Sequence, residues 1–159
     1  MKNIFVLSAL GFSCGLPYML VFSTLSAWLR DAGAALTVIG FISWAALTYS
    51  LKFLWSPFVD RIKMPLNQAF GQRRSWILMM QLLILILIMM MSQFDPISSL
   101  NFIVITAVLI AFFGSLQDIA VDAYRIELVS LDEQGNLAAS YQFGYRLAIL
   151  VATSLALIF

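Results

Sequence analysis

The chain has 159 residues, of which 62% are apolar and 11% charged, and its net charge at pH 7 is +1. Soluble domains are roughly 45–50% apolar, so a mean hydropathy of +0.96 indicates a chain that resides in a lipid bilayer. The near-neutral charge argues against nucleic acid as a partner, and the absence of histidine removes His-dependent catalytic triads, zinc sites and haem ligation. We therefore expect no enzyme, no catalytic residues, no cofactor and no metal site.

Apolar stretches long enough to cross a bilayer recur along the chain, since a helical span needs about 20 apolar residues. The first ends at the polar turn RDAGA and is too long for the apolar core of a signal peptide. We predict an all-α polytopic membrane protein with five spans, at about residues 4–29, 36–57, 75–93, 99–122 and 137–159.

The first span contains GFSCGLP, in which Gly11 and Gly15 are four residues apart and Pro17 follows. Small residues at this spacing predict close packing against another helix, and the proline predicts a kink. The alternative is that irregular backbone here lines a cavity near the membrane midplane, with Tyr18 facing that cavity.

Basic residues predict the orientation of the chain in the membrane. Four of them lie between the second and third spans and Lys2 precedes the first, whereas the loops on the other side carry only Arg30. The N-terminus and the loop 60–75 are therefore predicted to be cytoplasmic, which places Phe159 on the opposite side. Lys52, near the end of the second span, either snorkels to this interface or has a functional role.

The fourth span has an uninterrupted apolar core, Phe102–Leu116, that is shorter than a bilayer requires. Either the span starts earlier, or Asp118 lies at hydrocarbon depth. Asp118, Asp122 and Arg125 are spaced i, i+4 and i+7, which places them on one face of a helix. An intramembrane carboxylate costs about 2.5–3.5 kcal/mol and normally faces the bundle interior. The three residues are candidates for proton coupling. The alternative is that these charged groups and the following Glu127 mark the membrane interface, and it applies more to Arg125 and Glu127 than to Asp118.

Arg146 lies nine residues after Leu137, where we expect the fifth span to begin. At ~1.5 Å per residue this places it about 14 Å along the helix, too deep for easy snorkelling. We therefore predict that Arg146 pairs with Asp118 or Asp122 of the preceding span.

Several stretches, in order and over nearly the whole chain, resemble the AmpG-like permeases of the major facilitator superfamily: GFSCGLPYML, STLSAWLRDAG, SLKFLWSPFVDR, GQRRSW, QDIAVDAYRIEL and GYRL. The loop 60–75 also resembles the cytoplasmic signature of the superfamily, G-x-x-x-D-R-x-G-R-R. Ser56 replaces its first glycine and residues 62–70 are inserted. The residues that match or echo it are Asp60, Arg61, Gly71, Arg73 and Arg74.

The resemblance implies a proton-driven permease of the bacterial inner membrane that imports anhydro-muropeptides for peptidoglycan recycling. Related branches carry siderophores or acetyl-CoA. Asp118 or Asp122 would be the proton site, because desolvation in a helix bundle favours the protonated form of a carboxylate. Arg146, Lys52 and Tyr18 would contact the muropeptide-like substrate, and the signature residues would form a cytoplasmic latch between helices.

Superfamily transporters rock two six-helix halves around a central site. Five spans would supply only part of the N-terminal half, so we expect a truncated product that is inactive alone. The alternatives are half of a split transporter, completed by a second chain, and a non-transporting membrane remnant. The expected partners are the lipid bilayer, a small-molecule substrate and that second chain.

Overall fold

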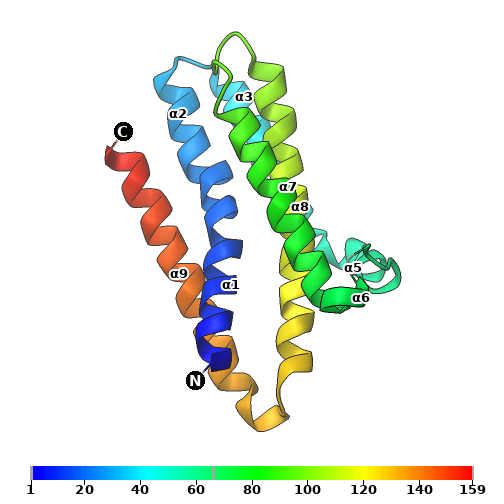
Figure 1. The fold of residues 1–159 in the computed structure, drawn as a ribbon. Helices are drawn as coiled ribbons and strands as arrows, with labels where there is room; N and C mark the ends of the chain where they lie inside the picture. Colours follow the sequence, from blue (N-terminus) through cyan, green and yellow to red (C-terminus); the bar gives the residue numbers. More distant parts are fainter. Residues whose placement is uncertain (1, 66, 159) are drawn as a thin grey trace.

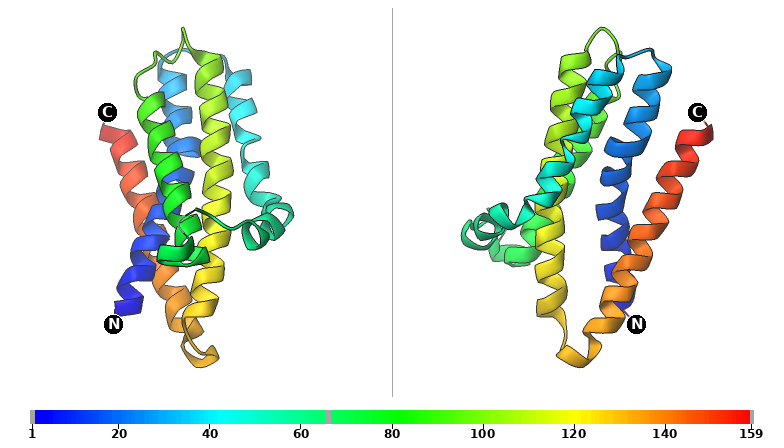
Figure 2. Two further views of the ribbon diagram at one scale, coloured as in Figure 1. Left: turned by 45° about the vertical axis from the view of Figure 1, so that its right-hand side comes forward. Right: turned by 180° about the vertical axis from the view of Figure 1, so that it is seen from behind.

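Figure 1 shows the computed structural model, which describes residues 2–65 and 67–158, without the side chains of residues 2, 131 and 155–158. Every regular element in the described ranges is helical. The loops after residues 31 and 91 lie at one end of the molecule (Figures 1 and 2). The N-terminus and the turn after residue 128 lie at the other, and the chain runs up and down between them.

The first predicted span is one continuous helical segment from Asn3 to Asp31. It comprises α1 (Lys2–Met19), a π-helical turn (Leu20–Thr24) and α2 (Leu25–Asp31). Pro17 lies inside α1 and has no N–H to donate to the helix. The irregularity that follows it is a π turn, a wider turn that a helix tolerates without ending.

The second predicted span is helical but broken. It comprises α3 (Leu36–Ser43), α4 (Ala46–Ser50) and α5 (Lys52–Arg61), and the part up to residue 50 makes an angle of 53° with α5. The break falls at Leu51, whose φ of −93° and ψ of 12° are not helical. Pro57 lies within α5, so the proline is not the site of the bend.

The third and fourth predicted spans are long helices. After the short α6 (Asn67–Phe70), α7 (Gln72–Met91) and α8 (Leu100–Leu128) run antiparallel to each other (Figure 2). The 29 residues of α8 extend about 43 Å, more than the ~30 Å of hydrocarbon in a bilayer. The predicted span 99–122 is therefore continued by six further helical residues, which carry Arg125 and Glu127 on the same helix as Asp118.

A 3-10 turn (Leu131–Glu133) leads into α9 (Gln134–Ile158), the predicted fifth span. Among the described residues three helices are long and apolar enough to cross a membrane, and the bent pair would make a fourth. The end of the fifth segment, Phe159, lies outside the described residues. The count of five spans and their boundaries stay predictions.

Helices α1 and α9 pack through their backbones. A Cβ added at Gly11 would collide with the carbonyl oxygen of Tyr141, and one at Gly15 would lie 2.8 Å from the carbonyl oxygen of Tyr145. Because only glycine allows this approach, the close packing predicted from the spacing of Gly11 and Gly15 is confirmed.

Helices α7 and α8 pack through large side chains instead. Trp76, Met80 and Ile84 are buried on the inner face of α7, whereas Leu82 and Met89 are more than half exposed on its outer face. The outer face suits contact with lipid tails, since it presents only aliphatic and thioether groups there.

Candidate functional site

Helix α8 brings the predicted carboxylate cluster to the interior of the bundle. Asp118 is partly buried, and its Oδ1 accepts a hydrogen bond of 3.3 Å from the hydroxyl of Tyr141 on α9. The thiol of Cys14 on α1 lies beside the same carboxylate. Asp118 therefore sits where three helices meet, and the partners it finds there are uncharged.

A polar network lies directly beside Asp118. Gln117 is 1% exposed, and its Nε2 donates to Ser13 Oγ at 3.0 Å and to Cys14 Sγ at 3.4 Å. Gln81 of α7 donates to the same Ser13 oxygen at 2.9 Å, and Ser13 donates to the Leu10 carbonyl. The sequence interpretation missed these residues, although a polar side chain within an apolar run is the signal that marks them.

Asp122, one turn further along α8, has charged partners. Its Oδ2 lies 3.4 Å from Lys52 Nζ, and its Oδ1 lies 3.6 Å from a guanidinium nitrogen of Arg125. Arg125 also lies over the ring of Tyr141, 5.9 Å from its centroid. The three residues predicted to share a face are thus brought together, and Lys52 joins them from the first position of α5.

Tyr18 lies in a cluster of aromatic side chains on the interior side of α1. Its ring centroid is 4.8 Å from that of Phe22, 5.2 Å from that of Tyr49 and 6.4 Å from that of Tyr145. Tyr49 packs its hydroxyl against Gly114 of α8. This cluster, drawn from α1, the π turn, α4 and α9 and packed against α8, adjoins the carboxylates through the neighbouring rings of Tyr145 and Tyr141.

The predicted pairing of Arg146 with an aspartate of α8 is wrong. Arg146 is exposed, and within the described part of the chain the aspartates of α8 contact other groups. The side of α9 that packs inward carries Tyr141, Gly144 and Ala148, and residue 146 is turned well away from it. Arg146 instead lines a shallow pocket of about 370 Å³ with Gln142, Ile149 and Leu150.

The predicted latch is partly assembled at the far end of α8. Arg73 donates to Asp60 at 2.6 Å and to Glu127 at 2.9 Å, which ties α5 and α8 to the start of α7. Gly71 precedes α7 with a φ of 82°, a conformation that favours glycine. Glu127, not predicted as a latch residue, completes the group.

The other two predicted latch residues lie apart from this ion pair. Arg74 contacts Tyr124, with its guanidinium 5.5 Å from the ring centroid and 3.3 Å from the hydroxyl oxygen. Arg61 is exposed and is absent from the ion pairs of the described side chains.

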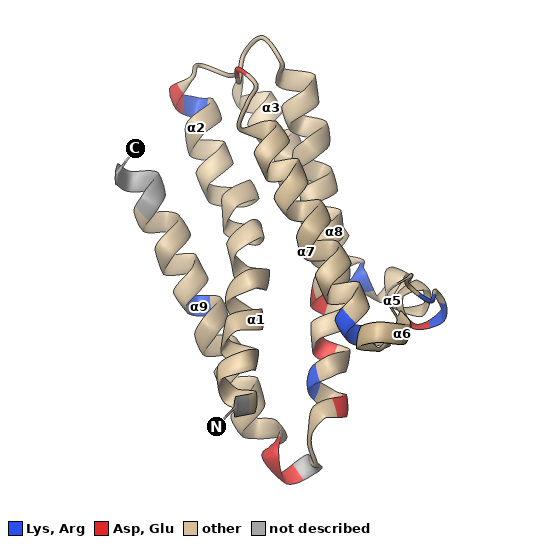
Figure 3. Cartoon of the chain, in the orientation of Figure 1, with Lys and Arg blue, Asp and Glu red and all other residues tan. Residues whose placement is uncertain are grey.

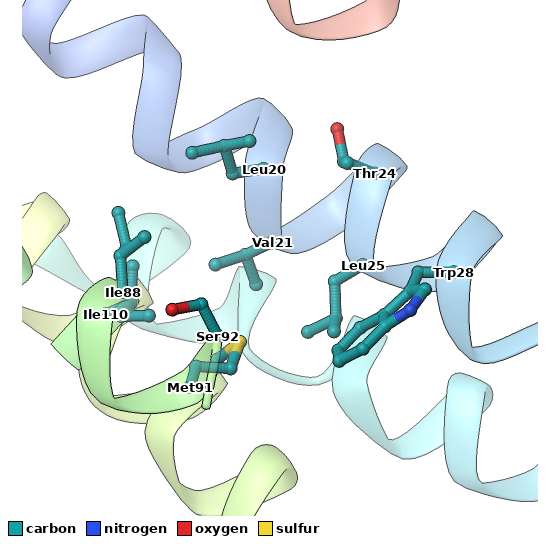
Figure 4. A pocket seen from close by; sticks show the side chains of 9 residues that line it. All are labelled: Leu20, Val21, Thr24, Leu25, Trp28, Ile88, Met91, Ser92 and Ile110. Carbon is teal, nitrogen blue, oxygen red and sulfur yellow. The ribbon is translucent and has the colours of Figure 1, made fainter. Parts of the chain in front are cut away.

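A separate apolar pocket of about 330 Å³ lies at the opposite end, between the first span, α7 and α8 (Figure 4). It is lined by Leu20, Val21, Thr24, Leu25, Trp28, Ile88, Met91, Ser92 and Ile110. The lining contains no charged side chain, and none of the predicted site residues takes part. Its chemistry suits apolar groups only.

Comparisons with known proteins agree with these features. A family model described as acetyl-coenzyme A transporter 1 matches residues 3–159. The anhydromuropeptide permease of Escherichia coli (strain K12) is 41% identical over 152 residues, which is 96% of this chain and 30% of that protein. Putative transporter AmpG 4 of Rickettsia felis is 37% identical over 155 residues, which is 98% of this chain and 37% of that protein.

The chain thus spans about a third of the length of these relatives. Their names describe transporters and permeases, which are not enzymes, in agreement with the class of protein predicted from the sequence. With its long apolar helices, it is a multi-pass bacterial membrane protein. The chain belongs to the AmpG-like family of major facilitator superfamily transporters.

Proposed function

We propose that this chain forms part of a proton-coupled importer of anhydro-muropeptides in the bacterial inner membrane, with its N-terminus in the cytoplasm and its substrate destined for peptidoglycan recycling. The remaining helices would come from further sequence or from a second chain, because transporters of this superfamily use two halves. The name of the Escherichia coli relative supports the substrate class.

The observation that carries the proposal is the setting of Asp118. Its partners, Tyr141 and Cys14, are uncharged, so the carboxylate can gain or lose a proton without breaking an ion pair. Asp122 is already compensated by Lys52 and Arg125. Between the two aspartates, Asp118 is the better proton site.

The contacts of Asp118 also suggest how protonation reaches the helices. It joins α8 to α9 and to α1, two helices that pack against each other. A protonated Asp118 is a donor as well as an acceptor, so its bond with Tyr141 would reverse or break. The spacing between α8 and α9 would then respond to the proton, as alternating access requires.

The ion pairs of Arg73 with Asp60 and Glu127 would hold one end state. These carboxylates are about half exposed, so the pairs are weak enough to open and reform. A latch of this kind sets which end of the transporter is closed without fixing it there.

Arg146 is the candidate contact for a substrate carboxylate. It is the middle residue of α9, where a cation facing lipid would cost about 2.5–3.5 kcal/mol. A site that binds an anion removes that cost. Tyr18 and its neighbours would stack against sugar rings, and Lys52 would contact substrate only after leaving Asp122.

A coenzyme A ester is the second candidate substrate, since the matching family model is described as an acetyl-coenzyme A transporter. Such a ligand is also anionic and would use the same cation, Arg146. The two candidate substrates can be distinguished by which unlabelled ligand, muropeptide or acetyl-CoA, inhibits uptake.

The test is a chimera in which this chain replaces the matched segment of the Escherichia coli permease. Reconstituted in vesicles, it should take up labelled anhydro-muropeptide when a pH gradient is imposed. Asp118→Asn should lower gradient-driven uptake at least about 100-fold, and the matched control Asp132→Asn, in an exposed turn, should not. An unchanged pH dependence in Asp118→Asn rejects the proton role. Inhibition by acetyl-CoA and not by muropeptide rejects the substrate.

A further inference from the structure

The segment from the end of α5 to the start of α7 projects sideways from the helix bundle (Figure 1). We call residues 58–74 the basic tip. Three of its apolar side chains point outward: Phe58 is 56% exposed, Ile62 48% and Phe70 50%. Exposed aromatic and aliphatic side chains gathered on one protruding segment indicate a surface that contacts an apolar partner, such as a membrane.

The basic tip is also cationic. It holds four Lys or Arg residues against a single acidic residue, Asp60, and Arg73 neutralises that one. Arg61, Lys63 and Arg74 are exposed and lie outside the ion pairs of the described side chains. Figure 3 shows the blue segments of the tip beside the lower half of α7.

Hydrogen bonds fix the tip at the level where α7 begins. The Ile62 carbonyl accepts from Gln72 Nε2 at 2.7 Å and from Trp76 Nε1 at 3.1 Å. Helix α7 is apolar enough to span the membrane, so its first turn marks the membrane boundary. The exposed apolar and basic side chains are therefore held at the boundary between hydrocarbon and headgroups.

We propose that the basic tip binds anionic phospholipids in the leaflet at this end of the molecule. Phe58, Ile62 and Phe70 enter the acyl boundary, and Arg61, Lys63 and Arg74 contact headgroup phosphates. An amphipathic surface with cations beside apolar anchors is the form that binds an anionic membrane surface. Lipid held against residues 58–74 would also support the latch, because Asp60 and Arg73 lie within the same segment.

This lipid site depends on insertion of the chain in a bilayer and is independent of the proposed substrate and of proton coupling. None of its residues contacts Asp118 or Arg146 among the interactions described above. Failure of muropeptide transport would therefore leave it untouched.

The test measures hydrogen exchange over residues 58–74 with the chain in nanodiscs of phosphatidylcholine, with or without about one quarter phosphatidylglycerol. The anionic lipid should slow exchange in the tip about fivefold or more. Arg61→Gln with Lys63→Gln should cancel that effect, and Arg30→Gln, an exposed cation at the opposite end, should preserve it.

Two further arms keep the outcome decisive. Phe58→Ser should speed exchange in both lipids, and high salt should reduce only the effect of phosphatidylglycerol. Equal exchange in the two lipids, or a lipid effect that survives loss of both cations, overturns the proposal. Matching helical content in phosphatidylcholine discs verifies that each variant is folded.

Discussion

Helix α8 carries carboxylates in two different settings. Asp118 faces the interior and is bonded to the neutral hydroxyl of Tyr141, whereas Glu127, nine residues or about 14 Å further on, is paired with Arg73 at the membrane edge. Glu127 is 56% exposed and Arg73 only 19%. Asp122 lies between them in sequence and is also intermediate in exposure: its side chain is 38% exposed and is paired with Lys52 and Arg125.

The difference in partners separates a carboxylate that can respond to protons from carboxylates that hold helices together. A cation beside a carboxylate stabilises its charge and ties two helices together. When the pair is exposed, breaking it costs little free energy, because water solvates both separated charges. A buried carboxylate with only neutral donors has no cation to stabilise its charge, and desolvation opposes that charge. Such a group therefore gains a proton more readily than one that is paired with a cation. The interior end of the cluster is thus suited to respond to protons, and the outer end to position helices.

Tyr141→Phe tests this difference between Asp118 and Glu127 most directly and should have the largest effect. It removes the hydroxyl that donates to Asp118 while keeping the ring beneath Arg125. A hydrogen bond to a charged group contributes about 1.5–3 kcal/mol, so gradient-driven uptake by the chimera should fall tenfold or more. Tyr145→Phe, a neighbouring tyrosine of α9 that makes no bond to Asp118, is the control. Equal losses in the two variants would contradict a special role for the Tyr141 hydroxyl.

Arg73→Gln should have the next largest effect, and on stability. It removes the ion pairs with Asp60 and Glu127 together, each contributing about 1 kcal/mol or less because the carboxylates are half exposed. Thermal unfolding in detergent should shift downward for Arg73→Gln and hardly at all for Arg61→Gln, whose side chain is exposed. If the difference in unfolding temperature between the two variants disappears in high salt, its origin is electrostatic. If that difference persists unchanged, the effect of Arg73→Gln comes from packing.

Lys52→Met should have a smaller effect. The Lys52–Asp122 pair is 3.4 Å long, both side chains are more than a third exposed, and Arg125 remains beside Asp122. We expect a change well below 1 kcal/mol in unfolding free energy. The variant should instead loosen the start of α5, visible as faster hydrogen exchange over residues 52–56. Unchanged exchange there would show that packing alone holds the bend at Leu51.

The sequence predicted the helices well, because long apolar runs have few other stable forms in a membrane. It also predicted two features that depend on local chemistry: the close approach at Gly11 and Gly15, and the participation of Asp60 and Arg73 in one charged group. Each rests on residues whose size or charge leaves few alternatives.

The partners across the bundle were not predictable in the same way. Assigning Arg146 to an aspartate of α8 assumed that neighbours in sequence face each other, yet the Gly11 and Gly15 contacts turn α9 toward α1. The Glu127–Arg73 pair and the role of Gln117 were missed for a related reason: the rotation of each helix depends on packing between distant segments. The break at Leu51 has no glycine or proline to mark it.

Asp95, in the loop before α8, gives a third setting for a carboxylate and the smallest expected effect. It accepts backbone N–H bonds from Ser98 at 2.8 Å and Ile97 at 3.1 Å, and the Ser98 bond lowers the pKa of Asp95 below its usual value. Since the folded state holds the lowered pKa, its small contribution to stability is complete above the ordinary pKa of an aspartate. That contribution is lost as the pH falls through the lowered value. A carboxyl-carbon NMR titration of the chain should show a midpoint for Asp95 below the ordinary aspartate pKa. A midpoint at or above that value would mean that neutral backbone donors do not hold charge here, and would weaken the distinction between neutral and charged partners drawn along α8.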